Sequence, residues 1–209
     1  MKVPQFALAA VCPALMFAQA VQPPAPDPLT VSDKLSFHFE KVYGPFAMLQ
    51  SGVQATVLQW HDNPHEWGEG WHGMWRRSAS TVGYDTIRNS FMFTANSVAG
   101  EDPRYLRMGD GAFVDRTTHA FEHTFVGRSD SGKRIPPWVR FASTYGAAFL
   151  ANCWSPDRLS NSSRALVRGT LTLASDTGNN LISEFWPDLK KKLFHRNQPR
   201  AAGVVVKTP

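Results

Sequence analysis

Two histidines and a glutamate are spaced as in a zinc-binding helix. His119, Glu122 and His123 form the pattern H-x-x-E-H. On a helix, residues four apart share a face, so His119 and His123 would bind one zinc ion through their ring nitrogens. Glu122 would activate a zinc-bound water. A catalytic zinc needs a third protein ligand, and the spacing singles out none of three downstream candidates: Asp157, Asp176 and Glu184. The pattern predicts, as one alternative, a small zinc-dependent hydrolase.

The same pattern has a simpler interpretation. It covers five residues, and a chain of 209 residues is much smaller than the peptidases that carry it. A pair of histidines on a helix surface or in a pocket is the more common origin of such a short match. The sequence therefore favours a protein without enzymatic activity and without a cofactor, and zinc is expected only under the hydrolase alternative.

A second segment nearly matches a phosphate-binding loop. The run from Gly127 to Arg134 follows G-x-x-x-x-G-K, but Arg134 stands where a hydroxyl should hold magnesium. Ile135-Pro136-Pro137 follows, whereas a phosphate loop opens directly into a helix. We expect a flexible polar connection here and no nucleotide site.

The N-terminus predicts export. Lys2 precedes an apolar stretch from Phe6 to Phe17 and then the small-x-small triplet Ala18-Gln19-Ala20, the pattern of a secretory signal peptide over residues 1–20. Residues 21–31 are rich in proline and predict an extended tether. The protein is then expected in the periplasm or at the periphery of an outer membrane. Cys153 is the only cysteine left after cleavage, so no internal disulfide forms, and we expect it to be buried.

Helical periodicity runs through most of the remaining chain. Ser32 is the expected N-cap of the first helix, and Asn63-Pro64 starts the third. The expected helices cover 32–42, 46–60, 64–99, 111–126, 136–152 and 160–184, and Pro187 starts a short basic helix over 188–195. The sequence thus predicts an all-α, single-domain bundle of about six amphipathic helices over 32–196, with a disordered tail over 197–209.

Composition and aromatic content indicate a partner surface. Charged residues make up 19% of the chain, below the usual share of about 25%, and the net charge of +5 is spread without a basic stripe, so nucleic acid is not expected. Seven Trp and 14 Phe are present, several beside cations, as in helices that lie at a membrane interface. Three segments show this: Trp75-Arg76-Arg77, Trp138-Val139-Arg140, and Phe185-Trp186 before Lys190-Lys191-Lys192.

Three functions remain open at this point. The first is a non-enzymatic cell-envelope protein whose helices associate with a membrane surface or an envelope partner; small residues four apart, such as Ala147/Ala151 and Ala165/Gly169, suit close helix packing in lipid or in a tight bundle. The second is the zinc hydrolase. The third is a soluble module that binds a hydrophobic ligand between its helices, which an aromatic-lined cavity would favour. An oligomer is compatible with all three.

Five short segments together carry a resemblance to a known group of proteins: Glu66-Trp67-Gly68, Glu101-Asp102-Pro103-Arg104-Tyr105, Asp130-Ser131-Gly132-Lys133, Asn152-Cys153-Trp154-Ser155-Pro156 and Glu184-Phe185-Trp186-Pro187-Asp188-Leu189. The chain from Ser32 to Phe194 resembles a family of exported, mostly helical bacterial proteins that has no established activity. The resemblance implies export and a single domain, and it supplies no catalytic residue. The H-x-x-E-H pattern is not a feature of that family, which weakens the zinc interpretation.

Overall fold

The computed structural model describes residues 27–194, and this part of the chain is a single all-α domain, as predicted. The predicted signal peptide, most of the tether and the predicted tail lie outside the described residues. Within the described range there are six α-helices: α1 (Val31–Tyr43), α2 (Pro45–Trp60), α3 (Gly70–Ala99), α4 (Phe113–Phe125), α5 (Trp138–Leu150) and α6 (Ser162–Phe194). Three single-turn 3₁₀ helices connect them: η1 (His65–Trp67), η2 (Ala151–Cys153) and η3 (Asp157–Leu159).

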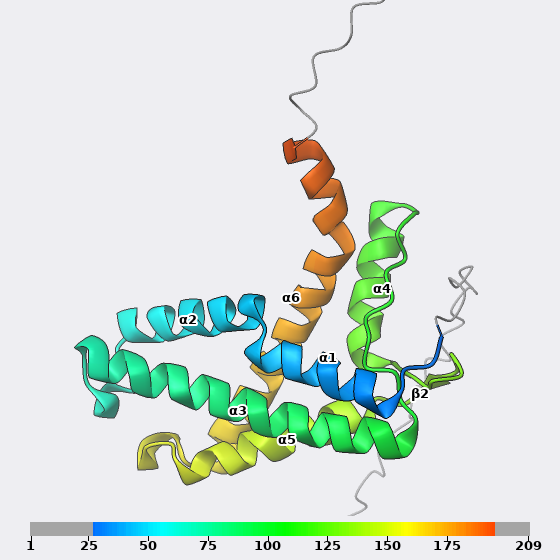
Figure 1. Ribbon diagram of the computed structural model, residues 1–209. Coiled ribbons are helices and arrows are strands. Elements are labelled where there is room, and N and C mark those ends of the chain that lie inside the picture. Colours follow the sequence, from blue (N-terminus) through cyan, green and yellow to red (C-terminus); the bar gives the residue numbers. More distant parts are fainter. Residues whose placement is uncertain (1–26, 195–209) are drawn as a thin grey trace, which may run out of the picture.

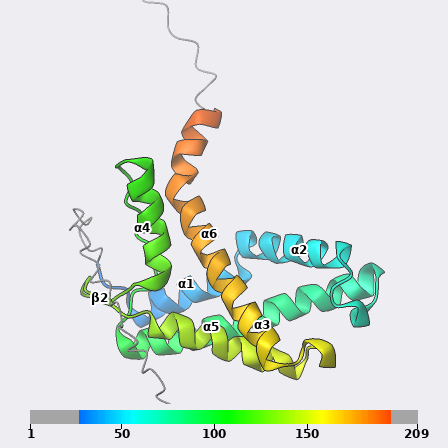
Figure 2. The ribbon, with the colours of Figure 1, turned by 180° about the vertical axis from the view of Figure 1, so that it is seen from behind.

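The helices form a layered body with a projecting arm (Figure 1). α1 and α2 both pack against α3, and α3 packs against α5. The first half of α6 packs on α5, while α4 packs along α6 further up. We call α4 and the second half of α6 (residues 178–194) the α4–α6 arm. It rises steeply from the body in Figure 1 and in the view from behind in Figure 2.

The first helix starts earlier than expected. Thr30, and not Ser32, is the N-cap of α1: its hydroxyl accepts a hydrogen bond from the Asp33 amide, and the Asp33 carboxylate accepts one from the Thr30 amide. This reciprocal arrangement is a capping box, in which two amides at the helix start are satisfied at once. The prediction missed it because Thr30 lies inside the segment assigned to the tether.

The third helix starts later than expected. The prediction placed its start at Asn63-Pro64, but that segment forms η1, and α3 begins only at Gly70. Gly68 and Gly70 have positive φ angles, which end the first turn before a longer helix can grow. The fully buried guanidinium of Arg77 holds the connection by donating to side-chain and backbone oxygens of Gln59, Asn63, Pro64 and Gly68.

Proline does not break the last helix. The predicted restart at Pro187 is wrong, because α6 continues through Pro187 to Phe194 as one helix of 33 residues. Side chains on both sides of the proline are anchored to α4, since Glu184 and Asp188 each form an ion pair with Arg116. These contacts hold the helix in place where the proline removes a backbone hydrogen bond.

The segment that resembles a phosphate loop is a small hairpin. Strands β1 (Gly127–Arg128) and β2 (Arg134–Ile135) pair antiparallel, and the Ser129 amide donates to the Lys133 carbonyl oxygen. No helix opens from this turn, so the expectation of a polar connection without a phosphate loop fits the backbone. The hairpin itself was not predicted, because strands of two residues leave no alternating pattern in the sequence.

The interior is polar and the exterior apolar. Six of the nine buried hydrophobic residues within 27–194 are alanines, whereas Arg77, Glu184, Asn96, Thr124 and Thr144 are the largest fully buried side chains. Many Phe, Trp and Leu side chains are exposed instead. Native interiors seldom enclose this many charged groups, so each needs a partner. Cys153, expected to be buried, is exposed and free.

Small residues explain how the body packs without large side chains. Ala147, Ala151 and Ala165 are buried together in one cluster with Tyr84, where α3, α5 and α6 meet. A Cβ added to Gly169 would lie 2.5 Å from the Tyr145 ring, so glycine is required for this approach of α6 to α5. The predicted pairs of small residues four apart therefore mark the α5–α6 interface.

Candidate functional site

The H-x-x-E-H residues line one side of α4 beside an aromatic ring. The Tyr105 ring lies 5.9 Å from the His119 ring and 4.8 Å from the His123 ring, between centroids. His119 Nε2 is 2.8 Å from the Leu106 carbonyl oxygen, so this nitrogen carries the proton. Glu122 faces Arg134 at 4.0 Å. The sequence thus correctly placed the two histidines on one helical face.

His123 is held neutral. Burial is the main cause that lowers the pKa of His123 to about 3, and the cations of Arg140 and Arg128 and the neighbouring His119 add to it. Arg140 donates a hydrogen bond to the backbone carbonyl oxygen of His123. The His123 Nδ1 atom is buried without a partner. The ring therefore remains uncharged between pH 5 and pH 8.

The space at this site is small and positively charged. A cavity of about 10 Å³ is lined by His119, Glu122, His123, Val126, Arg128 and Arg134. This volume holds roughly one water molecule. Two of the lining side chains are arginines, and a third arginine, Arg140, lies close to His123. Nearby cations oppose the binding of a divalent metal.

A complete set of metal ligands is not assembled at this site. Across the part of the chain that the structure describes, no three His, Cys, Asp or Glu side chains are grouped so that they could hold a metal ion. Two of the proposed third ligands are engaged elsewhere, Asp176 with Arg88 and Glu184 with Arg116, and Asp157 begins η3. Residues 27–194 therefore contain no three-ligand site for zinc. The zinc hydrolase stays a hypothesis.

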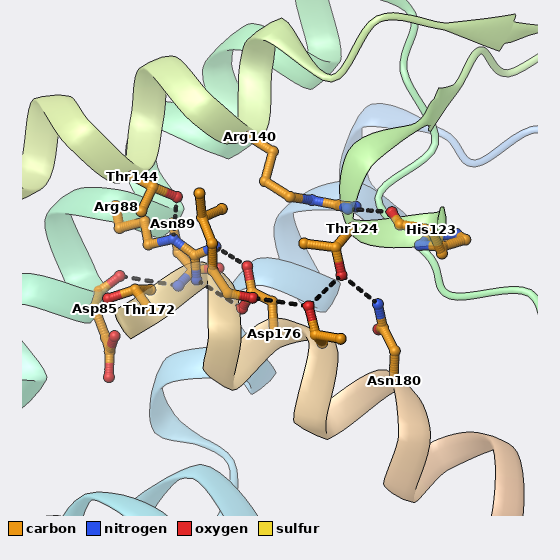
Figure 3. Close-up of polar contacts among 12 residues, drawn as sticks. Asp85, Arg88, Asn89, His123, Thr124, Arg140, Thr144, Thr172, Asp176 and Asn180 are labelled. Atoms are coloured by element: carbon orange, nitrogen blue, oxygen red, sulfur yellow. Dashed lines mark hydrogen bonds and ion pairs between the residues drawn. The ribbon is translucent and has the colours of Figure 1, made fainter. Parts of the chain in front are cut away.

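A polar network joins the helices of the body (Figure 3). Arg88 of α3 donates from Nε to the Thr144 hydroxyl of α5 at 2.9 Å and forms an ion pair with Asp176 of α6. Tyr84 donates to the Thr172 hydroxyl at 3.0 Å. Asp85 lies three residues before Arg88 on α3, a spacing that is common for ion pairs within a helix. Arg88 instead pairs with Asp176, 88 residues away, which no local spacing could indicate.

The network continues into the α4–α6 arm. The hydroxyls of Thr124 on α4 and Thr177 on α6 are 2.9 Å apart, and the Asn180 amide donates to Thr124 at 3.3 Å. Threonine and asparagine satisfy one another here, where an ordinary bundle would place leucine. These contacts fix the rotation of α6 about its axis, and with it the face that α6 turns outward.

Asp85 lacks the compensation that Arg88 and Asp176 give each other. Burial raises the pKa of Asp85 to about 6; the nearby Arg88 cation lowers it and the Asp176 carboxylate raises it. Figure 3 shows the Asp85 carboxylate turned away from the Arg88 guanidinium. A carboxyl group with this pKa is partly protonated near neutral pH, so Asp85 releases its proton at a higher pH than an ordinary aspartate does.

Glu184 anchors the α4–α6 arm. Its fully buried carboxylate accepts hydrogen bonds from the Tyr105 hydroxyl at 2.7 Å, from the Met108 and Gly109 amides at 3.0 Å, and from Arg116 Nε at 3.0 Å. Burial alone would raise the pKa of Glu184, but these hydrogen bonds outweigh burial and lower it. The residue considered as a zinc ligand is thus a structural acceptor.

The outward face of α6 is apolar. Val167 and Leu171 are four residues apart and therefore share one helical face, and both are exposed. The stripe continues along the arm through four side chains that are 48% to 66% exposed: Ile182, Trp186, Leu189 and Leu193. The consecutive lysines 190–192 lie beside it and are exposed. The buried face of α6 is instead the polar one that carries Asp176 and Glu184.

A groove lined by indole rings lies along α3. Its volume is about 560 Å³, within the range of small-ligand sites. The Trp154 ring is fixed there by a 2.9 Å hydrogen bond from Nε1 to the Ser80 hydroxyl. The sequence named an aromatic cavity as a mark of ligand binding but could not locate it, because its walls come from distant segments: Trp67, Trp75, Arg76, Ala79, Ser80, Gly83, Ile87 and Trp154.

These features define an all-α protein with a polar interior and an apolar, tryptophan-rich exterior. No helix between residues 27 and 194 is long and apolar enough to cross a bilayer. Comparison with protein-family models, curated proteins and solved structures found no match for this chain. The resemblance to a family of exported helical proteins therefore stays a prediction, and the function is argued from the geometry alone.

Proposed function

We propose that this protein is a non-enzymatic cell-envelope protein that binds the surface of a membrane through the distal half of α6. The observation that carries the proposal is the stripe of Ile182, Trp186, Leu189 and Leu193, which is exposed beside lysines 190–192. Apolar side chains with a central tryptophan, flanked by lysines, are typical of helices that lie in a membrane interface.

The geometry of the arm supports this use of α6. The stripe follows the spacing i, i+4, i+7 and i+11, so its four side chains lie on one face of the helix. Glu184 and Asp188 hold the other side of the helix against Arg116 of α4. The apolar face is therefore presented by a fixed support, and binding does not require this segment to fold first.

The lysines and the apolar side chains would contribute separately. Each lysine near an anionic surface adds about 1 kcal/mol of attraction, which salt screens. Insertion of Trp186 and Leu189 removes apolar area from water, which salt does not screen. The predicted signal peptide would place the protein where it meets a periplasmic membrane surface. Salt can thus distinguish the two contributions.

Removal of the apolar contribution should weaken membrane binding. For the double variant Trp186→Ala/Leu189→Ala we expect an affinity for vesicles of phosphatidylcholine and phosphatidylglycerol at least about 10-fold below that of the native chain. Sedimentation with a vesicle series measures it. The matched control is Trp138→Ala/Leu150→Ala on α5, which also removes two exposed apolar side chains. Equal losses in both double variants would contradict a specific role of α6.

The indole-lined groove favours a second function, binding of a small hydrophobic ligand. Three indoles and the single cation Arg76 suit a flat apolar molecule with one negative charge. We expect saturable binding of 2-naphthoate in calorimetry, weakened about 10-fold by Trp75→Leu. Trp71→Leu is the control, because Trp71 is exposed on the same helix outside the groove. Unchanged binding to the Trp75 variant would exclude the groove as the site.

A further inference from the structure

Helix α2 exposes an apolar face and has no charged residue. Its 16 residues contain no Lys, Arg, Asp or Glu. The side toward α3 is small and polar, with Ser51 and Ala55 buried. The opposite side exposes 52% to 86% of each of five large side chains: Phe46, Leu49, Val53, Val57 and Trp60. Nothing in the described chain covers this face.

The spacing of the five side chains is symmetric about Val53. Leu49 and Val57 lie four residues to either side, and Phe46 and Trp60 lie seven residues to either side. Because residues separated by three, four or seven positions share a helical face, all five form one straight stripe. A two-fold rotation about an axis through Val53, perpendicular to the helix, superimposes the stripe on itself. Phe46 and Trp60, the large aromatic residues at the two ends, then exchange places.

We propose that the α2 face binds a second copy of this chain in an antiparallel pair of α2 helices, with the two-fold axis at Val53. Phe46 of each copy then meets Trp60 of the other, and Leu49 meets Val57. A two-fold interface uses the same patch on both subunits, so it requires a patch that is complementary to itself when reversed. The symmetric spacing meets that requirement.

Charge favours a second copy as the occupant. The chain carries a net charge of +5, so two copies repel each other at most contacts. The α2 face is free of charge along its whole length, and a pair of α2 helices opposes no like charges. A membrane-binding helix, by contrast, normally has cations along its polar side, as α6 does and α2 does not.

The exposed area is close to what a stable dimer needs. The five side chains expose on the order of 600 Å² per copy, judged from the area that aromatic and aliphatic side chains bury. A standard interface buries about 800 Å² per partner, so α2 alone supplies most of it. Both ribbon views show α2 projecting to the side away from α4, where a second copy has access (Figures 1 and 2).

The test is cross-linking at the two-fold axis. The chain from Val21 onward, which lacks Cys12, is prepared with Cys153→Ser so that a single new cysteine remains. Val53→Cys should form a disulfide-linked dimer nearly completely under mild oxidation, because facing Cα atoms of a close helix pair are within disulfide reach. Leu171→Cys, at an equally exposed position of α6, is the control and should remain mostly monomeric.

Two further variants establish the direction and the occupant. Phe46→Cys alone should not cross-link, whereas Phe46→Cys together with Trp60→Cys should, which distinguishes an antiparallel pair from a parallel one. Val53→Glu should weaken dimerisation at least 100-fold in sedimentation velocity while circular dichroism stays unchanged. The proposal is overturned if the native chain sediments as a monomer at all concentrations, or if Val53→Glu reduces vesicle binding alone, which would assign α2 to the membrane.

Discussion

Glu184→Gln is expected to destabilise the fold by about 3 to 5 kcal/mol, because it breaks a buried ion pair and turns one acceptor oxygen into a donor. Arg116 would keep Asp188 as its ion-pair partner and its hydrogen bond to the backbone carbonyl oxygen of residue 184, but it would lose the buried carboxylate. At least one of the donors from Tyr105, Met108 and Gly109 would face an amide NH₂. A domain of this size is stable by about 5 to 15 kcal/mol, so the loss is large. Urea denaturation followed by circular dichroism measures it.

The matched control is Glu40→Gln, the same substitution at an exposed position of α1. We expect a change within about 0.5 kcal/mol there. Hydrogen exchange should in addition show that the amides of residues 105–109 lose protection first, since Glu184 accepts two of them directly. A stability of the Glu184 variant equal to that of the Glu40 variant would contradict the anchoring role.

Asp85→Asn is expected to stabilise the protein at pH 8 by up to about 3 kcal/mol and to leave it unchanged at pH 4. The pKa of Asp85 is about 6 in the fold against 3.8 in the unfolded chain, so the unfolded state releases the proton first. Stability is therefore lost as pH rises from about 4 to about 6. The asparagine cannot ionise and escapes this loss.

Thermal unfolding at several pH values measures the effect. Asp110→Asn, in an exposed loop, is the control. It should change the unfolding temperature by the same small amount at pH 8 and at pH 4. His123 acts in the opposite sense, because its pKa of about 3 makes protonation easier in the unfolded chain and destabilises the fold as pH falls below about 6.5. An Asp85 variant that is less stable than the native chain at pH 8 would refute the burial argument.

Local patterns were enough to predict the helices and the all-α class. Caps, prolines and glycines sit at fixed positions relative to helix ends, and four of the six helices were predicted within two residues of both ends. The errors occurred where distant contacts override a local signal. Arg77 ties the η1 turn to α2, and Arg116 supports α6 across Pro187.

Periodicity could not reveal which face of each helix is buried. On α6 the stripe that begins with Val167 and Leu171 would ordinarily face the core. The opposite face is buried because Asp176 and Glu184 find arginine partners on α3 and α4, 88 and 68 residues away. Pairing across such distances leaves no trace in spacing, so the inverted arrangement became visible only in three dimensions.

The candidate sites were predictable to different degrees. The two histidines of H-x-x-E-H share a face because that follows from helix geometry alone. The arginines around them come from the β-hairpin and α5, so the charge at the site was not foreseeable. For the distal half of α6, the sequence already indicated Trp186 and the three lysines, because they are neighbours in the chain.

Vesicle flotation of the chain from Val21 onward, purified without detergent, tests the proposed membrane function most directly. At about 0.1 M salt the lysines attract anionic vesicles, whereas at about 1 M salt this attraction is screened. We predict that the protein floats with the vesicles under both conditions, because the apolar stripe of α6 inserts. Protein that remains at the bottom of the gradient at high salt would contradict insertion through α6, and protein that remains there at both salt concentrations would contradict membrane binding altogether.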